Sequence, residues 1–221
     1  MHGVFDIVGP IMIGPSSSHT AGAARLGKMA RIILGEEPVE ARIELHGSFA
    51  HTYKGHGTDK ALVAGLLGFA TDDERLRQAL IIAGEKGLRV SFAAVDLGSV
   101  HPNTVAMNLT SQSGRSTRVV GASVGGGNIL ITEIDGYAVE LTGSYHTMIA
   151  VQQDKPGIIS LITHALAQEG VNIAYMRVSR QERGALALMI IEADDPISPE
   201  ALHLVQGISA VKVALLVPPI Q

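Results

Sequence analysis

The segment from residue 145 to residue 217 has an order of predicted strands and helices that few folds accommodate. "YHTMIAVQQ" predicts a strand, "DKPG" a turn and "IISLITHALAQEG" an amphipathic helix. Two strands around a Gln-Glu-Arg-Gly turn follow, then a helix that begins at Ser198 with Pro199 as its first residue, and finally the strand "AVKVALLV". The order βαββαβ over about 75 residues predicts a ferredoxin-like sandwich.

The rest of the chain predicts a mixed α/β domain, so we expect an α+β protein with domains over residues 1–144 and 145–221. The pattern turns helical from Thr20, and Gly35 is expected to end that helix. Further elements are expected as follows: a strand in "EARIELHGSFA" (40–50), a glycine-rich turn in "KGHGTDK" (54–60), a helix in "KALVAGLLGFA" (60–70) capped by Thr58 or Asp59, one helix over 71–87, a strand over 89–97, and strands broken by glycines over 117–141.

Composition excludes several classes of protein. The 221 residues carry a formal net charge of −4, which gives no basic footprint for nucleic acid. The chain contains no cysteine, which excludes disulfides, thiolate zinc sites and iron–sulfur clusters held by its own cysteines. No stretch approaches the ~20 apolar residues of a membrane span, and "MHGVFDIVGP" lacks the features of a secretion signal. We therefore expect a cytoplasmic protein.

The stretch "GPSSSHTAG" (14–22) places five small or polar side chains at the start of a predicted helix. A helix N-terminus presents unpaired N–H groups and the positive end of a dipole, so added hydroxyls make a seat for a carboxylate or phosphate. The alternative is that one serine caps the helix and the others belong to a loop. Caps are common, which favours the alternative for an isolated serine-rich helix start, although a cap needs no histidine.

The stretch "GSFAHTYKGHGTDKA" (47–61) places His56 between two glycines, ahead of a predicted helix. The pattern predicts an anion-binding loop with a titratable group in it. It is not a dinucleotide fingerprint, which requires a third glycine at a fixed offset, and it lacks a Walker lysine. His51 is close enough to remain a candidate.

Two further stretches are ambiguous by themselves. In "GSVHPNTVAMN" (98–108), Pro102 holds His101 away from helical geometry, and the alternative is a turn with a surface histidine. In "SVGGGN" (123–128), three glycines allow close approach of the backbone, and the alternative is a β-bulge or a sharp bend. Together the stretches supply histidines in glycine-rich polar loops, which suits proton transfer on a small anionic substrate.

Taken in order within one domain, "GPSSSHTAG", "GHGTDKA", "HPNT" and "SVGGGN" closely resemble the beta chain of bacterial iron–sulfur L-serine dehydratases. The first domain thereby also resembles the allosteric substrate-binding domain of some phosphoglycerate dehydrogenases. The C-terminal βαββαβ unit, with "DKPG" after its first strand and "VNIAYM" after its first helix, resembles an ACT domain. The resemblance covers essentially the whole chain.

The resemblance implies conversion of L-serine to pyruvate and ammonia without pyridoxal phosphate. It implies a 4Fe–4S cluster held by cysteines of a separate alpha chain, and a beta chain that is inactive alone. His56 and His101 are implied jointly as the acid–base candidates, and no metal ligand is implied in this chain. The implied substrate-binding residues are Ser16, Ser17, Ser18, His19 and Thr20 for the carboxylate, Thr58 and Asp59 for the amine or for loop order, and Asn103 for orientation.

The ACT resemblance implies either a regulatory amino-acid site or a purely structural, dimerising module. Homodimer contacts through the ACT or the N-terminal domain are expected in either case. The implied ligand-binding residues are Asp154, Lys155, Pro156, Gly157 and Asn172.

Three alternatives remain open. The strongest is a non-catalytic amino-acid-sensing regulatory subunit. A detached regulatory half of a phosphoglycerate dehydrogenase is disfavoured because a mere sensor has little need for "HPNT" or "GHGTD". A zinc hydrolase is less favoured still, because the histidines lie far apart without a pattern such as HExxH.

Overall fold

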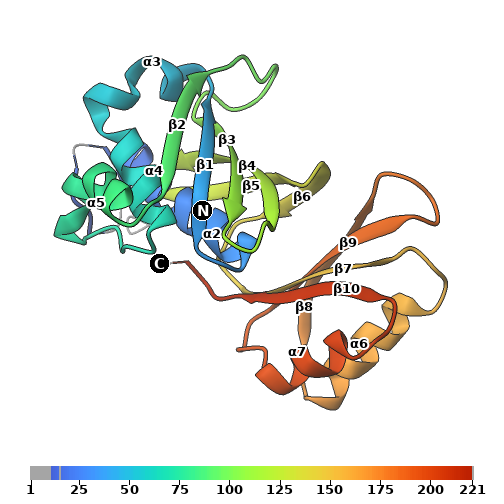
Figure 1. Cartoon of the computed structure of the whole chain (residues 1–221). Coiled ribbons are helices and arrows are strands. Elements are labelled where there is room, and N and C mark those ends of the chain that lie inside the picture. Colours follow the sequence, from blue (N-terminus) through green and yellow to red (C-terminus); the bar gives the residue numbers. More distant parts are fainter. Residues whose placement is uncertain (1–10, 15, 221) are drawn as a thin grey trace, which may run out of the picture. The chain divides into compact units, whose positions relative to one another are not determined.

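The computed structural model describes residues 11–14 and 16–220, which divide into two compact units. The first contains the described residues up to Asp135 together with Ile220, and the second contains residues 136–219 (Figure 1). The division by contacts falls after Asp135, and the expected boundary between residues 144 and 145 stays a prediction. Among the described residues, no helical segment combines the length and the hydrophobicity that a membrane span requires.

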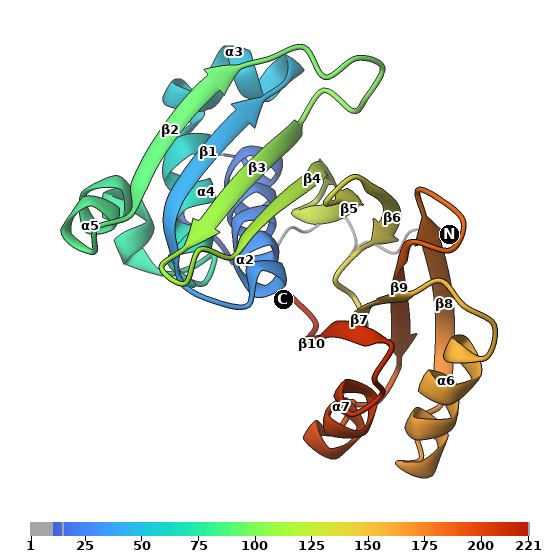
Figure 2. The same ribbon diagram turned by 45° about the vertical axis from the view of Figure 1, so that its right-hand side comes forward.

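The first unit is a mixed sheet with helices against it (Figure 2). Strand β1 pairs in parallel with β2 and antiparallel with β3, and β3, β4 and β5 follow as antiparallel neighbours. Its elements are η1 (Ser17–Gly22), α2 (Ala23–Leu34), β1 (Pro38–Leu45), α3 (Gly47–His56), α4 (Thr58–Leu66), η2 (Glu74–Gln78), α5 (Ala79–Glu85), β2 (Arg89–Ala94), β3 (Thr104–Ser111), β4 (Ser116–Gly125) and β5 (Asn128–Ile134).

The core of this unit depends on close contact between α2 and α4. Leu26, Met29 and Ile33 are buried at helical spacing, and Gly35 ends α2 in the left-handed conformation at φ 77°, as the sequence predicts. Gly27 and Gly65 bring the two helices together. A Cβ on Gly65 would lie 2.0 Å from the Ala24 carbonyl oxygen, so no larger residue fits without moving backbone.

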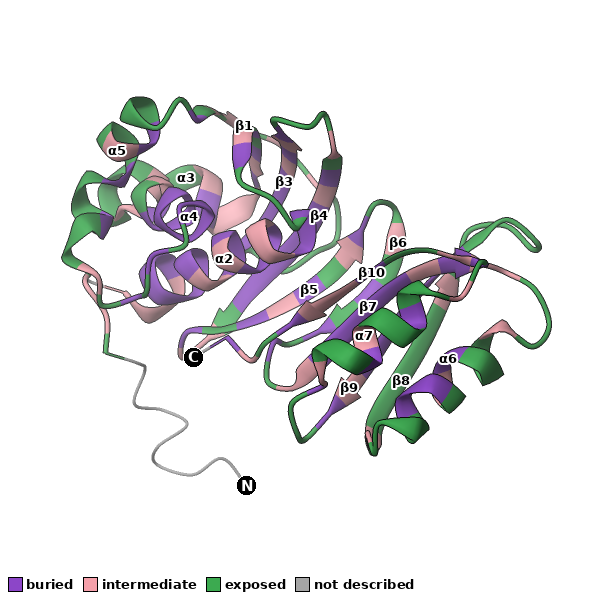
Figure 3. Cartoon of the chain, turned by 60° about the horizontal axis from the view of Figure 1, so that its bottom comes forward, coloured by how far each residue is buried: buried purple, intermediate pink, exposed green. Residues whose placement is uncertain are grey.

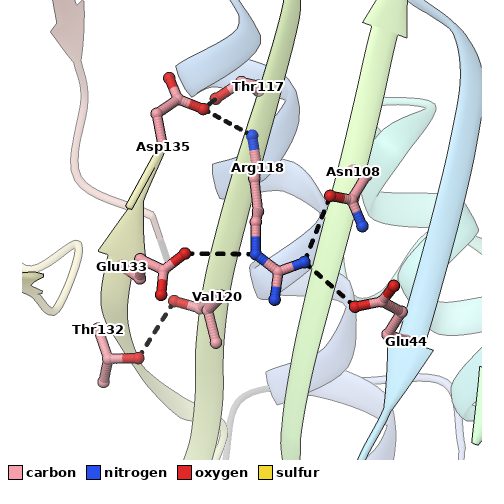
Figure 4. Close-up of polar contacts among 8 residues, drawn as sticks. All are labelled: Glu44, Asn108, Thr117, Arg118, Val120, Thr132, Glu133 and Asp135. Carbon is pink, nitrogen blue, oxygen red and sulfur yellow. Dashed lines mark hydrogen bonds and ion pairs between the residues drawn. The ribbon is translucent and has the colours of Figure 1, made fainter. Parts of the chain in front are cut away.

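The open face of the sheet is polar. Along β1, Ala41 and Ile43 are buried while the residues between and beside them face outward. Arg118 on β4 ties four strands together there, with Nη1 3.1 Å from a Glu44 carboxylate oxygen and Nε 3.3 Å from one of Glu133 (Figure 4). Its Nη1 also donates to Asn108 Oδ1 at 3.3 Å. These cross-strand contacts fix the register of β1, β3, β4 and β5.

Three local expectations for this unit are wrong. Residues 47–56 form the helix α3 instead of strand and glycine-rich turn, and Gly57 rather than Thr58 or Asp59 is the N-cap of α4. The first N–H groups of α3 find an acceptor in the distant carbonyl of Pro102, which a local pattern does not reveal. Residues 71–87 do not form one helix: a 3₁₀ helix, η2, precedes the short helix α5.

The second unit has the predicted βαββαβ order. An additional strand, β6 (Tyr137–Leu141), precedes it. The four-stranded sheet has the order β10-β7-β9-β8, and its neighbours are antiparallel. Its elements are β7 (His146–Gln153), α6 (Ile158–Gln168), β8 (Ile173–Arg180), β9 (Leu186–Ala193), α7 (Pro199–Gln206) and β10 (Val211–Val217).

The core of the second unit lies between this sheet and one side of each helix. Ile162, Ala165 and Leu166 form the buried stripe of α6, whose other side is exposed (Figure 3). They pack with Met148 and Met189 of the sheet. This arrangement confirms the expected ferredoxin-like fold and the α+β class.

Candidate functional site

The first motif forms the start of a continuous helical segment. Ser16 is the N-cap of η1: its Oγ accepts from the His19 backbone N–H at 3.3 Å, and its carbonyl accepts from Thr20 at 2.9 Å. Ser17 and Ser18 are half-buried in the first turn. One serine therefore caps, as the alternative proposed, but Ser17 and Ser18 lie in the helical turn and not in a loop. Pro15 lies outside the described residues. The segment is a π-helical turn, a geometry that is frequent at functional sites.

His19 is buried at the centre of a polar cluster. Its Nδ1 lies 3.4 Å from Ser16 Oγ and its Nε2 lies 3.3 Å from Ser48 Oγ, so both ring nitrogens have a hydroxyl partner. Its ring meets Phe49 edge-on at a centroid distance of 5.2 Å and His56 at 4.7 Å. Two effects lower the pKa of His19: burial is the larger, and the nearby His56 is the smaller. The neutral imidazole is thereby favoured.

His56 is the last residue of α3, not part of a flexible loop. Gly57 follows at φ 71° and turns the chain directly into α4. His56 is exposed, so its ring is available to a ligand while its inner side contacts His19. Thr58 is completely buried, and Asp59 accepts from the Lys60 backbone N–H at 2.8 Å.

The "HPNT" loop packs against the start of α3. The Pro102 carbonyl accepts from the Ser48 N–H at 2.8 Å, and a Cβ on Gly47 would lie 2.6 Å from the same oxygen. The His101 ring is exposed, and its Nδ1 accepts from the Asn103 backbone N–H at 3.1 Å. In the neutral imidazole the proton is therefore on Nε2. Among the described contacts, none joins the His101 ring to His19 or His56.

The "SVGGGN" stretch is a bulged hairpin turn between β4 and β5, as the structural alternative predicted. It nevertheless belongs to the same neighbourhood. A Cβ on Gly22 would lie 2.1 Å from Ser123 Oγ, and the Ser123 N–H donates to the Asn103 carbonyl at 3.1 Å. Arg25 donates to the Gly127 carbonyl at 2.9 Å. The four motifs are thus contiguous in space.

The interior of this region contains polar atoms with no hydrogen-bond partner among the described residues. They are Thr20 Oγ1, Thr58 Oγ1, Ser123 Oγ and Arg25 Nε. Buried polar atoms are normally satisfied, and those that are not often mark a site for a ligand or for water. In the described part of the chain, no three His, Asp or Glu side chains lie together as metal ligands.

Sequence reasoning missed Ser48 and Phe49, which position His19. No local signal identifies them, because 29 residues separate Ser48 from His19 and only the fold joins α3 to η1. His51, left open as a candidate, is exposed, and its Nδ1 lies 2.6 Å from the Gly47 carbonyl oxygen.

The residues expected to bind a ligand in the second unit are placed around the start of α6 and β8. The Asp154 carboxylate accepts from Arg180 at 2.8 Å and from the Gly184 N–H at 2.9 Å. These two hydrogen bonds lower the pKa of Asp154, and the bond from the Gly184 N–H has the larger effect. Gly157 is the N-cap of α6 at φ 89°. The other three, Lys155, Pro156 and Asn172, are exposed.

Comparison with known proteins agrees with this arrangement. The sequence model of the family described as serine dehydratase beta chain matches residues 3–133, and that of the ACT domain matches residues 146–203. The chain belongs to the serine dehydratase beta chain family. These matches confirm both the resemblance of the four motifs and the ACT domain.

Individual relatives point the same way. The chain is 47% identical over 199 residues to the probable L-serine dehydratase beta chain of Bacillus subtilis, covering 90% of each. It is 36% identical over 208 residues to the L-serine dehydratase beta chain of Peptoniphilus asaccharolyticus, covering 94% of each. It is also 28% identical to a D-3-phosphoglycerate dehydrogenase of Archaeoglobus fulgidus, over 82% of this chain and 34% of that one.

Proposed function

We propose that this chain is the beta subunit of a cytoplasmic L-serine ammonia-lyase that converts L-serine to pyruvate and ammonia together with an alpha chain. Membership in the serine dehydratase beta chain family supports the reaction class. The observation that carries the catalytic part is the contact between His19 and His56, with ring centroids 4.7 Å apart. Burial, and to a smaller extent the nearby His56, lower the pKa of His19, so a neutral imidazole lies directly beside the acid–base candidate His56.

The proposed reaction removes a proton from Cα of L-serine and the hydroxyl from Cβ, which together leave as water. The resulting aminoacrylate tautomerises to an imine, and hydrolysis of the imine gives pyruvate and ammonia. A proton next to a carboxylate is hard to remove, and a positioned acid–base group contributes roughly 10²–10⁴-fold to such a step. This chain supplies the acid–base groups.

We assign acid–base roles to His56 and His101. His56 is exposed, and its ring contacts the buried ring of His19. We assign His19 to positioning His56, and the lowered pKa of His19 favours a neutral ring beside it. His101 suits donation, because the Asn103 N–H occupies its Nδ1 and leaves the proton on Nε2. Which histidine takes the α-proton is left to the pH profile of each variant.

The substrate carboxylate is proposed to bind at the start of η1. Ser17 and Ser18 lie in the first turn, where backbone N–H groups lack helical acceptors and the helix dipole is positive. The family pattern adds Ser16, His19 and Thr20 to this seat, Thr58 and Asp59 to the amine or to loop order, and Asn103 to orientation. These assignments are to be tested by substitution.

The 4Fe–4S cluster that the resemblance implies does not fit this chain. Such clusters are held by cysteine thiolates, and the 221 residues contain no cysteine. We therefore place the cluster on the alpha chain, and no step of the proposed reaction is derived through it. Pyridoxal phosphate is not part of the proposal.

The ACT unit is proposed to associate with a second copy of this chain or to bind an amino acid. Strand β8 forms an edge of the sheet, and Tyr175, Met176 and Val178 on it are exposed. Because Asp154 is already bonded to Arg180 and Gly184, ligand binding at this loop requires that those bonds be exchanged. Calorimetric titration with L-serine of the unmodified chain and of Asp154→Asn separates the two roles, since a purely dimerising ACT unit gives the same binding heat in both.

The experiment that tests the proposal is an anaerobic pull-down of this chain from its native cell extract. We expect a cysteine-containing partner, iron, and pyruvate formation from L-serine in the eluate, and no turnover by the isolated chain. Robust turnover by the isolated chain would contradict the division between two subunits. A homo-oligomer that binds serine without partner or iron would contradict the catalytic assignment.

The runner-up is a non-catalytic amino-acid-sensing regulatory subunit. The similarity to a D-3-phosphoglycerate dehydrogenase favours this sensing alternative. The match covers most of this chain but about a third of the Archaeoglobus protein, so most of that dehydrogenase has no counterpart in this chain. His56→Asn distinguishes the two functions. Loss of turnover with intact assembly supports catalysis, whereas loss of feedback alone supports sensing.

A further inference from the structure

A cavity of about 240 Å³ lies behind His56, between the segment that leads into η1 and the elements α3, α4 and η2. Its polar wall is strongly basic. Lys54, His56, Lys60 and Arg77 line it, and no Asp or Glu is among its described lining residues. We call these four side chains and the cavity they line the basic pocket.

The cations of the basic pocket lack the partners that nearby cations have. On η2, Arg75 makes a salt bridge with Asp73 and lies over the Phe69 ring, with its Cζ 4.2 Å from the ring centroid. Arg77, two residues further on, has no ion pair among the described residues, and neither does Lys60. Within the described part of the chain, the one interaction partner of the Lys54 ammonium is the ring of its neighbour Tyr53, with 5.8 Å from Nζ to the centroid. Uncompensated cations around one cavity favour an anionic ligand.

Two hydrogen-bonding features converge on the same cavity. Thr20 lines it and is 1% exposed, yet its hydroxyl has no partner among the described residues. Gly57, which also lines it, is the N-cap of the nine-residue helix α4. The positive end of that helix therefore borders the cavity. A buried donor, a helix N-terminus and three cations together form a preorganised anion site.

We propose that the basic pocket binds a small anion through its phosphoryl or carboxylate group. The volume of about 240 Å³ is below that of pockets for drug-sized ligands, so it suits an inorganic anion or an acid of a few carbon atoms. Lys54, Lys60 and Arg77 have no part in the proposed dehydratase chemistry. The pocket shares His56 and Thr20 with the proposed substrate site and extends it by these three cations, so the inference rests on the proposed function for its place but is tested by binding and not by turnover.

Binding is measured on the full chain by titration calorimetry, with inorganic phosphate in one series and acetate in the other. Chloride holds the ionic strength constant. We expect saturable binding to one site per chain, weakened roughly tenfold or more in Lys60→Gln and in Arg77→Gln, since each loses a charge-assisted hydrogen bond. Lys86→Gln, an exposed lysine outside the pocket, is the matched control and should bind like the unmodified chain.

The two series identify the ligand group. Tighter binding of phosphate assigns a phosphoryl group, and comparable binding of acetate assigns a carboxylate. Urea unfolding shows whether each variant is folded, and Lys60→Arg, which keeps the charge, should restore most of the affinity. Absence of saturable binding of both anions, or unchanged affinity in the Lys60→Gln/Arg77→Gln double variant, would overturn the proposal.

Discussion

In the first unit, the hydroxyls of Thr20, Thr58 and Ser123 are buried without a partner among the described residues. In the second unit, the buried Thr147 donates to the Tyr145 carbonyl at 3.1 Å. One buried polar atom of the second unit, Gln152 Oε1, also lacks a described partner, but it stands alone there. Each unsatisfied buried group costs about 1–3 kcal/mol. The first unit therefore gives up stability around its motifs, which is expected of a site for a ligand.

The two units also differ in what they expose. The first unit surrounds the exposed His56 with cations and with the hydroxyl of Thr20. The second unit engages Asp154 in its own bonds and exposes apolar side chains on β8 and α6, such as Tyr175 and Leu161. Polar groups held ready for a ligand suit chemistry, and exposed apolar groups on an edge strand suit association. The predictions below test this difference.

The largest expected effect is on kcat, and it is tested by replacing one exposed histidine in each unit. His56→Asn should lower kcat of the assembled enzyme roughly 10²–10⁴-fold, because the acid–base group is lost. His164→Asn changes an exposed histidine of α6 and should leave kcat within about twofold of the unmodified enzyme. Both are assayed as complexes with the alpha chain, after a pull-down that checks assembly. Equal rates for the two variants would contradict a catalytic His56.

The second prediction concerns packing in the first unit. Gly65→Ala should lower the free energy of unfolding by about 1–3 kcal/mol, because the new Cβ would meet the backbone of α2. Gly84→Ala, a helical glycine with nothing within 4 Å of its Cβ position, is the control. It should be neutral or stabilising by about 0.4–1 kcal/mol. Urea unfolding measures both, and a neutral Gly65→Ala would show that α2 and α4 can separate without cost.

The third prediction compares one buried threonine from each unit. Thr58→Val removes an unpartnered hydroxyl and should raise the free energy of unfolding by about 1 kcal/mol. Thr147→Val removes a hydroxyl that has an acceptor and should lower it by about 1 kcal/mol. Urea unfolding of both variants gives the two signs. A loss of stability in Thr58→Val would mean that its hydroxyl is bonded, to ordered water for example, and the contrast would fail.

The smallest expected effect is a pH dependence of stability in the first unit. The pKa of His19 is lowered from 6.5 in the folded chain, so below about pH 6.5 the unfolded chain binds more protons there. The contribution of His19 to the free energy of unfolding therefore falls as pH drops below about 6.5, and it stops falling once the folded chain also takes up the proton. Urea unfolding of His19→Asn from about pH 8 to about pH 5 should show a shallower decline than the unmodified chain. His164→Asn serves as the control, and identical slopes for His19→Asn and the unmodified chain would refute the assignment.

Many residues of the candidate site could be predicted from the sequence, but the contacts between them could not. His19 and His56 both stood out by their glycine-rich and hydroxyl-rich surroundings, and a serine cap was one of the two alternatives, although the sequence did not say which serine it would be. The hydroxyl of Ser48 was missed, although it lies 3.3 Å from His19 Nε2. The grouping of Lys54, Lys60 and Arg77 was equally invisible, because α3, α4 and η2 meet only in the folded chain.

Local physical chemistry determined the elements whose signals lie within a few residues. The helical spacing of Leu26, Met29 and Ile33 and the left-handed Gly35 fixed α2, and the alternation of strands and helices after residue 145 fixed the βαββαβ unit. Tertiary structure alone decided α3, where Phe49 is the one buried residue and the Pro102 carbonyl accepts the first N–H groups. It also decided the pairing of His19 with His56 and the pKa of His19, because burial and neighbouring charge arise only when distant segments pack together.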